Sequence, residues 1–158
     1  MNTTRLVYRL ENASNQRGVY TGGGYGVINE WLYEKTGSKN CAKHPTPSED
    51  SLLTKNCNEA NIAPFGGFWR FGFKSMAQLR AWFFDDTILD MLANEGIVFT
   101  VYEVTDEKEF IDGNAQIVFH GDCHIEANRK LSVSPKRLND DLKSDDDVKA
   151  AIELGLTN

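Results

Sequence analysis

The sequence has little that would place it in a membrane or in a disulfide-rich secreted class. No apolar run approaches the roughly 20 residues that cross a bilayer, and the first residues, Met1 to Leu6, lack the apolar core of a signal peptide. The chain has only three Cys in 158 residues, an odd number that fits a reducing compartment better than a disulfide framework. These absences predict a cytoplasmic protein, in a bacterial or host cell, with no membrane partner.

The common phosphate-binding signatures are missing too. Four Gly lie between Tyr20 and Gly26, but they do not follow a strand in the G-x-G-x-x-G manner and no P-loop Lys accompanies them. Two interpretations of the loop predicted over residues 12–26 stay open. It is a flexible surface loop, or it covers a ligand that Tyr20 and Gly22 contact.

Positive charge is scarce relative to negative charge. The net charge is −6, and the segment from Leu138 to Asn158 carries six acids against two Lys, or −4 of that total. Charge of this sign repels phosphate backbones, so nucleic acid is disfavoured as a partner. We predict one domain over residues 1–137 and an acidic C-terminal tail over residues 138–158, with a short helix that Asp145 caps.

Aromatic residues, by contrast, are concentrated in one stretch. Six of the nine Phe and two of the three Trp lie between Phe65 and Phe84. The pattern predicts a strand over 68–73 and a helix capped by Ser75, with Gln78 three residues on as in a capping box. Asp85 is placed to cap a second helix that stops at Gly96, and a β-branched strand follows over 97–104.

The remaining elements complete a single α+β domain with a mostly antiparallel sheet. We expect the strand over 115–120 to pair with the strand over 97–104, and the polar segment over 38–63 to be irregular. The other predicted elements are a strand over 4–11, a short helix over 27–36, a strand over 128–134 and the helix over 145–154.

Cysteine and histidine form two short pairs that could bind a metal. Cys41-x-x-His44 lies in the long polar segment, and His120-x-x-Cys123 follows a predicted strand. Together they offer four ligands for tetrahedral zinc. The alternatives are unrelated surface His with half-buried Cys, or a Cys–His nucleophile, for which no third orienting group is evident.

Three further residues have side chains suited to binding a nucleotide. Arg9 stands beside Tyr8 in the first strand, and a guanidinium pairs bidentately with phosphate. Ser75 opens a helix and Gln116 opens a strand, and either side chain can bond a ribose hydroxyl. Each also has a structural interpretation: Arg9 as an exposed strand residue, Ser75 as a helix cap, and Gln116 as an edge residue.

The order of these motifs resembles the ADP-ribosyltransferase-like fold. The resemblance rests on Tyr8-Arg9, on Phe71-Gly-Phe-Lys-Ser75, on Val101-Tyr-Glu-Val and on Gln116-Ile-Val-Phe. It implies NAD as cofactor, Tyr8, Arg9 and Ser75 as NAD-binding residues, and Gln116 at the catalytic position. Gln116 replaces the usual Glu of that family, and Lys74 precedes the Ser where a small or hydroxyl residue is common.

Three functions follow as hypotheses. The first is a nucleotide-binding protein of the ADP-ribosyltransferase-like type, which transfers ADP-ribose or only binds. The second is a non-enzymatic protein that binds and inhibits a protein partner, such as an anti-defence or host-takeover factor, because aromatic residues are concentrated near Phe65 to Trp69, no complete catalytic set is evident and the C-terminal tail is acidic. The chain also resembles small phage-encoded or accessory bacterial proteins. The third is a small zinc-stabilised domain.

Overall fold

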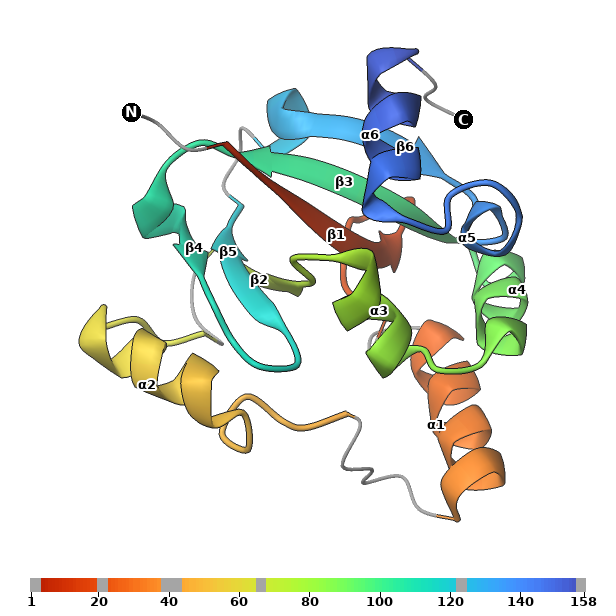
Figure 1. Ribbon diagram of the computed structural model, residues 1–158. Helices are drawn as coiled ribbons and strands as arrows, with labels where there is room; N and C mark the ends of the chain where they lie inside the picture. The colour runs from red at the N-terminus through yellow and green to blue at the C-terminus, as the bar shows by residue number, and fades with distance from the viewer. Residues whose placement is uncertain (1–3, 20–22, 38–43, 65–67, 122–124, 156–158) are drawn as a thin grey trace.

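Two three-stranded antiparallel sheets form the centre of the computed structural model, which describes residues 4–19, 23–37, 44–64, 68–121 and 125–155 (Figure 1). The strand orders are β1-β3-β6 and β2-β5-β4. The strands are β1 (Arg5–Asn12), β2 (Trp69–Gly72), β3 (Ile97–Val104), β4 (Phe110–Ile111), β5 (Ile117–His120) and β6 (Arg129–Val133). The helices are α1 (Gly23–Thr36), α2 (Ser51–Glu59), α3 (Met76–Trp82), α4 (Asp86–Asn94), α5 (Arg137–Asp140) and α6 (Asp145–Glu153), with 3₁₀ turns η1 (Glu107–Glu109) and η2 (Ile125–Asn128). The predicted α+β class with antiparallel strands is confirmed.

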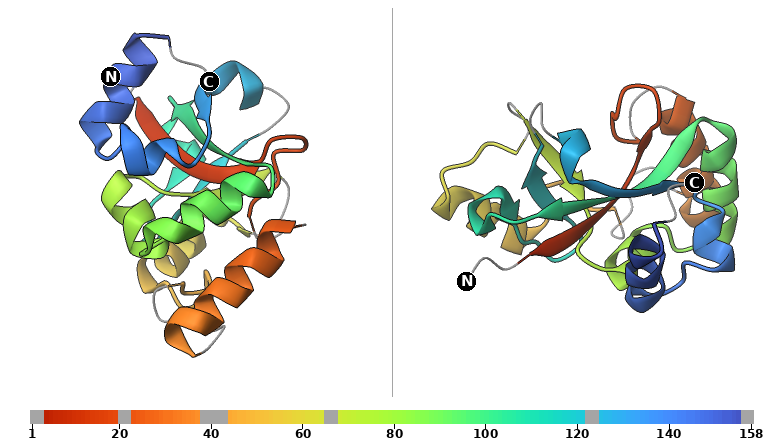
Figure 2. Two further views of the ribbon diagram at one scale, coloured as in Figure 1. Left: turned by 90° about the vertical axis from the view of Figure 1, so that its right-hand side faces the viewer. Right: turned by 90° about the horizontal axis from the view of Figure 1, so that it is seen from above.

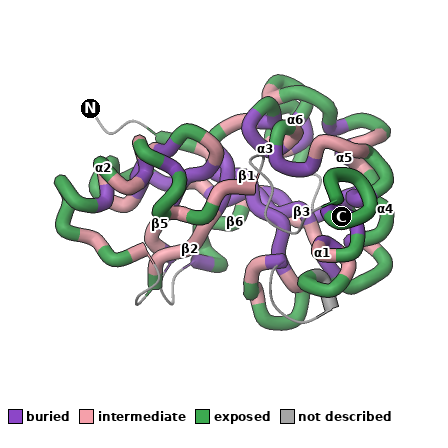
Figure 3. Tube along the Cα trace, turned by 90° about the horizontal axis from the view of Figure 1, so that it is seen from below, coloured by how far each residue is buried: buried purple, intermediate pink, exposed green. Residues whose placement is uncertain are grey.

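The elements stack in layers around three groups of buried side chains. One face of the first sheet packs on α1, α3, α4, α5 and α6, and its other face packs on the second sheet through Val7, Tyr102 and Phe119. The outer face of the second sheet is covered by α2, through Leu53 and Cys57. The right-hand view of Figure 2 shows α2 at the opposite end of the molecule from α1, α4 and α5, and Figure 3 shows the buried residues running through the centre.

The first strand is buried on both faces, because it lies between these layers. It pairs with β3 along its whole length, from Arg5 opposite Val104 to Asn12 opposite Ile97. Tyr8 also exchanges two backbone hydrogen bonds of 2.8 Å with Phe73, just beyond β2. This bridge joins the two sheets, and β1 and β2 separate beyond it.

The aromatic stretch folds as its caps predict. Ser75 accepts a hydrogen bond from the Gln78 backbone N–H at 3.1 Å, and Asp85 accepts one from Thr87 at 3.0 Å. The Gln78 side chain accepts a hydrogen bond from the backbone N–H of Lys74. In a capping box this donor would be the N–H of Ser75, so the contact is shifted by one residue toward the N-terminus. Gly96 follows α4 with a φ of +77°, the left-handed conformation that glycine adopts at lowest cost.

Several predicted elements were wrong. Helix α1 begins at Gly23 rather than at residue 27, because the second half of the Gly-rich stretch continues into the helix. The strand over 115–120 does not pair with β3; as β5 it pairs with β2 and β4, since β1 and β6 already flank β3. Ser144, not Asp145, caps α6 and makes a reciprocal capping box with Asp147.

The segment over 38–63 contains a helix that we did not predict. Helix α2 is short, and its apolar face consists of Leu53 and Cys57, one turn apart. Its N-terminus is set by Asp50, whose carboxylate is 2% exposed and accepts backbone N–H groups from Leu53 at 3.2 Å, Asn114 at 2.9 Å and Ala115 at 2.9 Å. Two of these donors come from the loop before β5, so one carboxylate joins α2 to the second sheet.

We therefore expect Asp50→Ala to lower the free energy of unfolding by about 2–3 kcal/mol, because it removes a cap and leaves buried N–H groups without an acceptor. The measurement is urea unfolding at pH 7. The matched control is Asp106→Ala, which removes an exposed cap of η1 and is expected to cost about 1 kcal/mol or less. Equal decreases in the free energy of unfolding of the two variants would show that the burial of Asp50 contributes nothing to stability.

The acidic C-terminal segment packs against the first sheet. Leu138, Leu142, Val148 and Ala151 are all buried in the large helical core. The carboxylate of Asp145 also accepts the Met76 N–H at 2.8 Å, which ties α6 to the start of α3. No helix in the described part of the chain is long and apolar enough to span a membrane.

Candidate functional site

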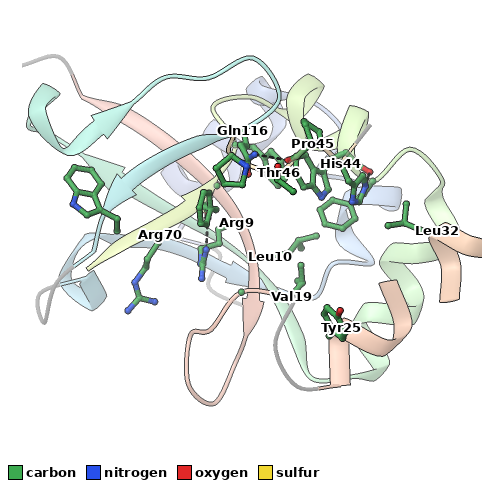
Figure 4. A pocket seen from close by; sticks show the side chains of 18 of the residues that line it. Arg9, Leu10, Val19, Tyr25, Leu32, His44, Pro45, Thr46, Arg70 and Gln116 are labelled. Carbon is green, nitrogen blue, oxygen red and sulfur yellow. Dashed lines mark hydrogen bonds between the residues drawn. The ribbon is translucent and has the colours of Figure 1, made fainter. Parts of the chain in front are cut away.

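A pocket of about 760 Å³ opens where β1 and β2 separate beyond the Tyr8–Phe73 bridge (Figure 4). Strands β1 and β2 form one side of it, α1 forms another, and residues 44–47 border a third. The lining residues are Arg9, Leu10, Gly18, Val19, Tyr25, Asn29, Leu32, His44, Pro45, Thr46, Pro47, Trp69, Arg70, Phe71, Gly72, Phe73, Trp82, Phe83 and Gln116.

The pocket has two chemically different parts. Arg9 and Arg70 project from neighbouring strands at one end, and Gln116 lies with Pro45 and His44 at another (Figure 4). Between and beyond them the lining is mainly apolar and aromatic, from Leu10, Val19, Leu32, Phe73, Trp82 and Phe83. A cavity with an apolar wall and a few convergent polar groups is the usual form of a small-molecule site.

Arg9 is the most constrained of the polar residues. It is 7% exposed, and its Nε donates to Glu11 Oε1 at 3.1 Å, while Nη1 donates to the Phe71 carbonyl oxygen. Glu11 is 1% exposed and also accepts from the Tyr102 hydroxyl, at 2.8 and 2.6 Å to its two oxygens. The interpretation of Arg9 as an exposed strand residue is therefore wrong. Arg9 faces the second sheet and fills the space between the sheets where backbone pairing has ended.

Burial dominates the electrostatics of this cluster. It lowers the pKa of Arg9 despite the attraction of Glu11, and it raises the pKa of Glu11 despite the hydrogen bond from Tyr102 and the charge of Arg9. Burial and then the nearby Glu11 charge raise the pKa of Tyr102. Removing one member of such a group leaves the others with uncompensated polar atoms in a low dielectric.

Arg70 was not among the predicted site residues. It lies on β2 and faces the first sheet, where its Nη1 donates to the Gln16 carbonyl oxygen at 2.9 Å. Arg9 Nη2 donates to the same oxygen at 3.2 Å. Arg70 stands between the aromatic residues Trp69 and Phe71, and Arg9 stands between Tyr8 and the aliphatic Leu10. A charge within an apolar strand was the signal that could have identified it.

His44 forms part of the aromatic wall. Its ring centroid lies 4.5 Å from that of Trp82 and 5.9 Å from that of Trp31, and its Nε2 hydrogen-bonds the Trp82 carbonyl oxygen. Burial lowers the pKa of His44 from 6.5 to about 4, so the ring is neutral at pH 7. The contact holds the segment that continues through Pro45 and Thr46 against the pocket.

Gln116 also lies in the pocket. It is 5% exposed, and its Nε2 donates to the Pro45 carbonyl oxygen at 3.0 Å. Because its side chain is buried, the interpretation of Gln116 as an edge residue is wrong. Its amide holds the 44–47 segment against the sheet.

Two of the other predicted nucleotide-binding residues, Tyr8 and Ser75, are not among the lining residues of the pocket. Tyr8 points to the opposite face of β1, into the helical core, and its hydroxyl hydrogen-bonds Asp145. Ser75 is the N-cap of α3, so its interpretation as a helix cap is confirmed. Tyr20 and Gly22 lie outside the described residues.

The predicted zinc ligands are only half described. Cys41 and Cys123 lie outside the described residues, so the four-ligand set stays a prediction. His44 is engaged with Trp82, and His120 Nδ1 lies 3.9 Å from Glu109 Oε1. Over the described ranges, no group of three or more His, Cys, Asp or Glu could hold a metal ion.

These features define an α+β protein of two antiparallel sheets with an arginine-lined apolar pocket beside their junction. The chain belongs to the family described as the bacteriophage T4 Y00F protein, whose family model matches residues 1–132. That match contains both sheets except the last residue of β6, together with every lining residue of the pocket. No curated protein and no solved structure matches the chain significantly. The expected phage origin thus holds at the level of the family.

Proposed function

We propose that this pocket binds a nucleotide-like small molecule, with an anionic group at the Arg9 end and a flat ring against the aromatic wall. The observation that carries the proposal is a buried guanidinium at the edge of an otherwise largely apolar cavity. A buried charge is costly unless it has a partner, and Arg9 shares its one carboxylate with Tyr102. A phosphate would give it a second charged partner.

The aromatic wall supports a ring-bearing ligand. Phe73, Trp82 and Phe83 lie together, with Phe73–Trp82 centroids 5.7 Å apart and Phe73–Phe83 centroids 6.1 Å apart. Aromatic faces stack on nucleobases with little dependence on which base is present. The pocket therefore suits a nucleotide as a class, and NAD and ADP-ribose are members of that class.

The chemistry of the lining favours binding over transfer of ADP-ribose. A carboxylate stabilises the positive charge that develops on a ribose during transfer, and a neutral amide does so poorly. Gln116 is an amide held by Pro45, and none of the described lining residues is Asp or Glu. We propose a protein that holds a nucleotide without cleaving it.

The test is a thermal shift and calorimetric titration with NAD, ADP-ribose, AMP and adenosine. A ligand at 100 times its Kd stabilises by about 2.7 kcal/mol, which raises Tm by roughly 5–10 °C in a chain of this size. Asn29→Trp, which places a bulky ring in the lining from α1, is expected to abolish the shift. Glu30→Trp, one residue on and exposed, is the matched control and should retain it.

No shift with any of the four ligands, in a protein with a cooperative unfolding transition, would exclude the proposal. A shift that survives Asn29→Trp would place the ligand elsewhere. Incubation with NAD followed by mass spectrometry separates binding from cleavage, and the expected result is intact NAD.

A second candidate, a protein that binds a protein partner, is supported by one exposed aromatic residue. Phe68 is 58% exposed and lies 5.9 Å from the His120 ring, at the end of β2 away from the helical core. Exposed rings of this kind anchor protein interfaces. If this candidate is right, Phe68→Ser should abolish the capture of a partner by the tagged protein and leave nucleotide binding unchanged.

A further inference from the structure

Arg9 and Arg70 hold one oxygen atom between them, and that atom belongs to the backbone. The Gln16 carbonyl oxygen accepts from Arg9 Nη2 at 3.2 Å and from Arg70 Nη1 at 2.9 Å. Guanidinium groups are well suited to bind phosphate oxygens, and here two of them converge on one oxygen. A neutral carbonyl is a weak occupant of that position, because it carries only a partial charge.

The charges around the oxygen leave an excess of one positive charge. Arg9 and Arg70 face a single buried carboxylate, Glu11, and Arg70 is close enough to disfavour the charged form of Arg9. Another acid bonded to this turn is Glu126, which accepts the side-chain amide of Gln16 at 2.9 Å and is exposed. An anion between the two Arg residues would offset this repulsion.

The peptide that supplies the oxygen adopts an unfavourable conformation. Gln16 has a φ of +62°, a region that residues other than glycine seldom adopt. Its N–H bonds the Asn12 carbonyl oxygen, and the Arg17 N–H bonds the Asn15 side chain, so the turn holds the carbonyl in place. Rotation of the Gln16–Arg17 peptide would remove the oxygen from the Arg residues without unfolding β1.

The guanidinium groups are accessible from the pocket. Both Arg9 and Arg70 line it, and so does Gly18, which packs beside the Arg9 guanidinium. A Cβ at Gly18 would lie 3.4 Å from Arg9 Nη2.

We infer that Arg9 and Arg70 form the phosphate subsite of the pocket, and that the Gln16 carbonyl oxygen occupies it in the free protein as a stand-in for a phosphate oxygen. The inference rests on the proposed nucleotide site and adds its charged subsite, a second phosphate-binding residue and a backbone movement on binding. It predicts selection for phosphorylated ligands over nucleosides.

The test titrates inorganic pyrophosphate, AMP and adenosine into the whole protein and into two variants. Arg70→Gln removes one positive charge from the subsite. It is expected to lower the affinity for pyrophosphate and for AMP by about tenfold or more and to leave the affinity for adenosine unchanged. Arg17→Gln is the matched control: it lies in the same turn, is exposed, changes the net charge equally and is outside the pocket lining. It is expected to change each affinity less than about twofold by long-range charge alone.

The backbone movement has its own readout. Pyrophosphate is expected to shift the Gln16 carbonyl carbon and the Arg17 amide in NMR spectra, and to leave the Gly96 amide unchanged. Pyrophosphate binding that is insensitive to Arg70→Gln, or that leaves the Gln16 carbonyl unmoved, would overturn the inference.

The two proposals fail in different ways. If adenosine and AMP bind equally and pyrophosphate does not bind, ring binding at the aromatic wall is supported and the phosphate subsite is overturned. If pyrophosphate binds in an Arg70-dependent manner and no nucleotide competes with it, the phosphate subsite is supported and the proposed nucleotide binding is overturned. If none of the probes binds, both are overturned.

Discussion

Arg9→Ala is expected to lower the free energy of unfolding by about 3–5 kcal/mol, the cost of leaving one partner of a buried ion pair alone. The substitution leaves the Glu11 carboxylate, 1% exposed, without its cation. It also removes the donors to the Phe71 and Gln16 carbonyl oxygens, at the point where β1 and β2 no longer pair. Urea unfolding at pH 7, monitored by tryptophan fluorescence, measures the loss.

Two further variants give this prediction its controls. Arg5→Ala lies in the same strand and is exposed, with its guanidinium over the Phe110 ring, and is expected to cost about 1 kcal/mol or less. Arg9→Met/Glu11→Met replaces the buried pair by apolar side chains and is expected to recover most of the stability. That folded double variant should still fail to bind pyrophosphate or AMP. A double variant as unstable as Arg9→Ala would show that the donated hydrogen bonds, not the charge pair, dominate.

The protein is expected to lose up to about 3 kcal/mol of stability between pH 6.5 and pH 4 through His44 alone. The unfolded chain binds a proton at this residue near pH 6.5, whereas burial keeps the folded ring neutral down to about pH 4. Between these values the unfolded state binds more protons, so stability falls as the pH falls. Protonation also places a charge beside Trp82 and Trp31 and loosens the segment that carries Pro45 to the pocket.

The measurement compares unfolding free energies at pH 7 and pH 4.5 in the wild type and in His44→Gln. The variant is expected to be less stable at pH 7, because it loses ring packing, and to show a smaller decrease on acidification. His120→Gln removes one imidazole elsewhere and serves as the control. An equal decrease in the wild type and His44→Gln would assign the acid sensitivity to other groups, with carboxylates the first to consider.

Local signals in the sequence were sufficient for much of the fold. The hydroxyl of Ser75 and the carboxylate of Asp85 cap their helices, and the β-branched run over 97–104 forms β3 with the predicted bounds. Such signals act within one or two turns of chain, so they can be interpreted without knowing the neighbours. Helix α2 was missed because its apolar face is only Leu53 and Cys57, too short a pattern to stand out in a polar segment.

Strand pairing was the part that sequence could not decide. The short spacing between β3 and β5 suggested that they form a hairpin. In the structure β3 is flanked by β1 and β6, and β5 pairs instead with β2 and β4. The choice depends on which apolar faces meet across the two sheets. That is a property of all six strands together and not of any two neighbours in the chain.

The candidate site divides in the same way. Residue type alone marked Arg9, Gln116 and His44 as capable of chemistry, and all three line one pocket. It also marked Ser75, whose side chain is used as a cap. Arg70 was missed, because in a strand of alternating aromatic residues nothing local tells a solvent-facing charge from one that meets a second arginine.

The sequence by itself determined the class of fold, the helix caps, the strand β3 and the presence of charges within apolar strands. The tertiary structure alone decided that β1 is buried on both faces, that Arg9 and Arg70 converge on the Gln16 carbonyl oxygen, and that Gln116 closes one end of the pocket. The physical reason is the distance along the chain between the residues that interact. Caps and periodicity are set by contacts a few residues apart, whereas Arg9 and Arg70 are brought together by two sheets packing on a shared core.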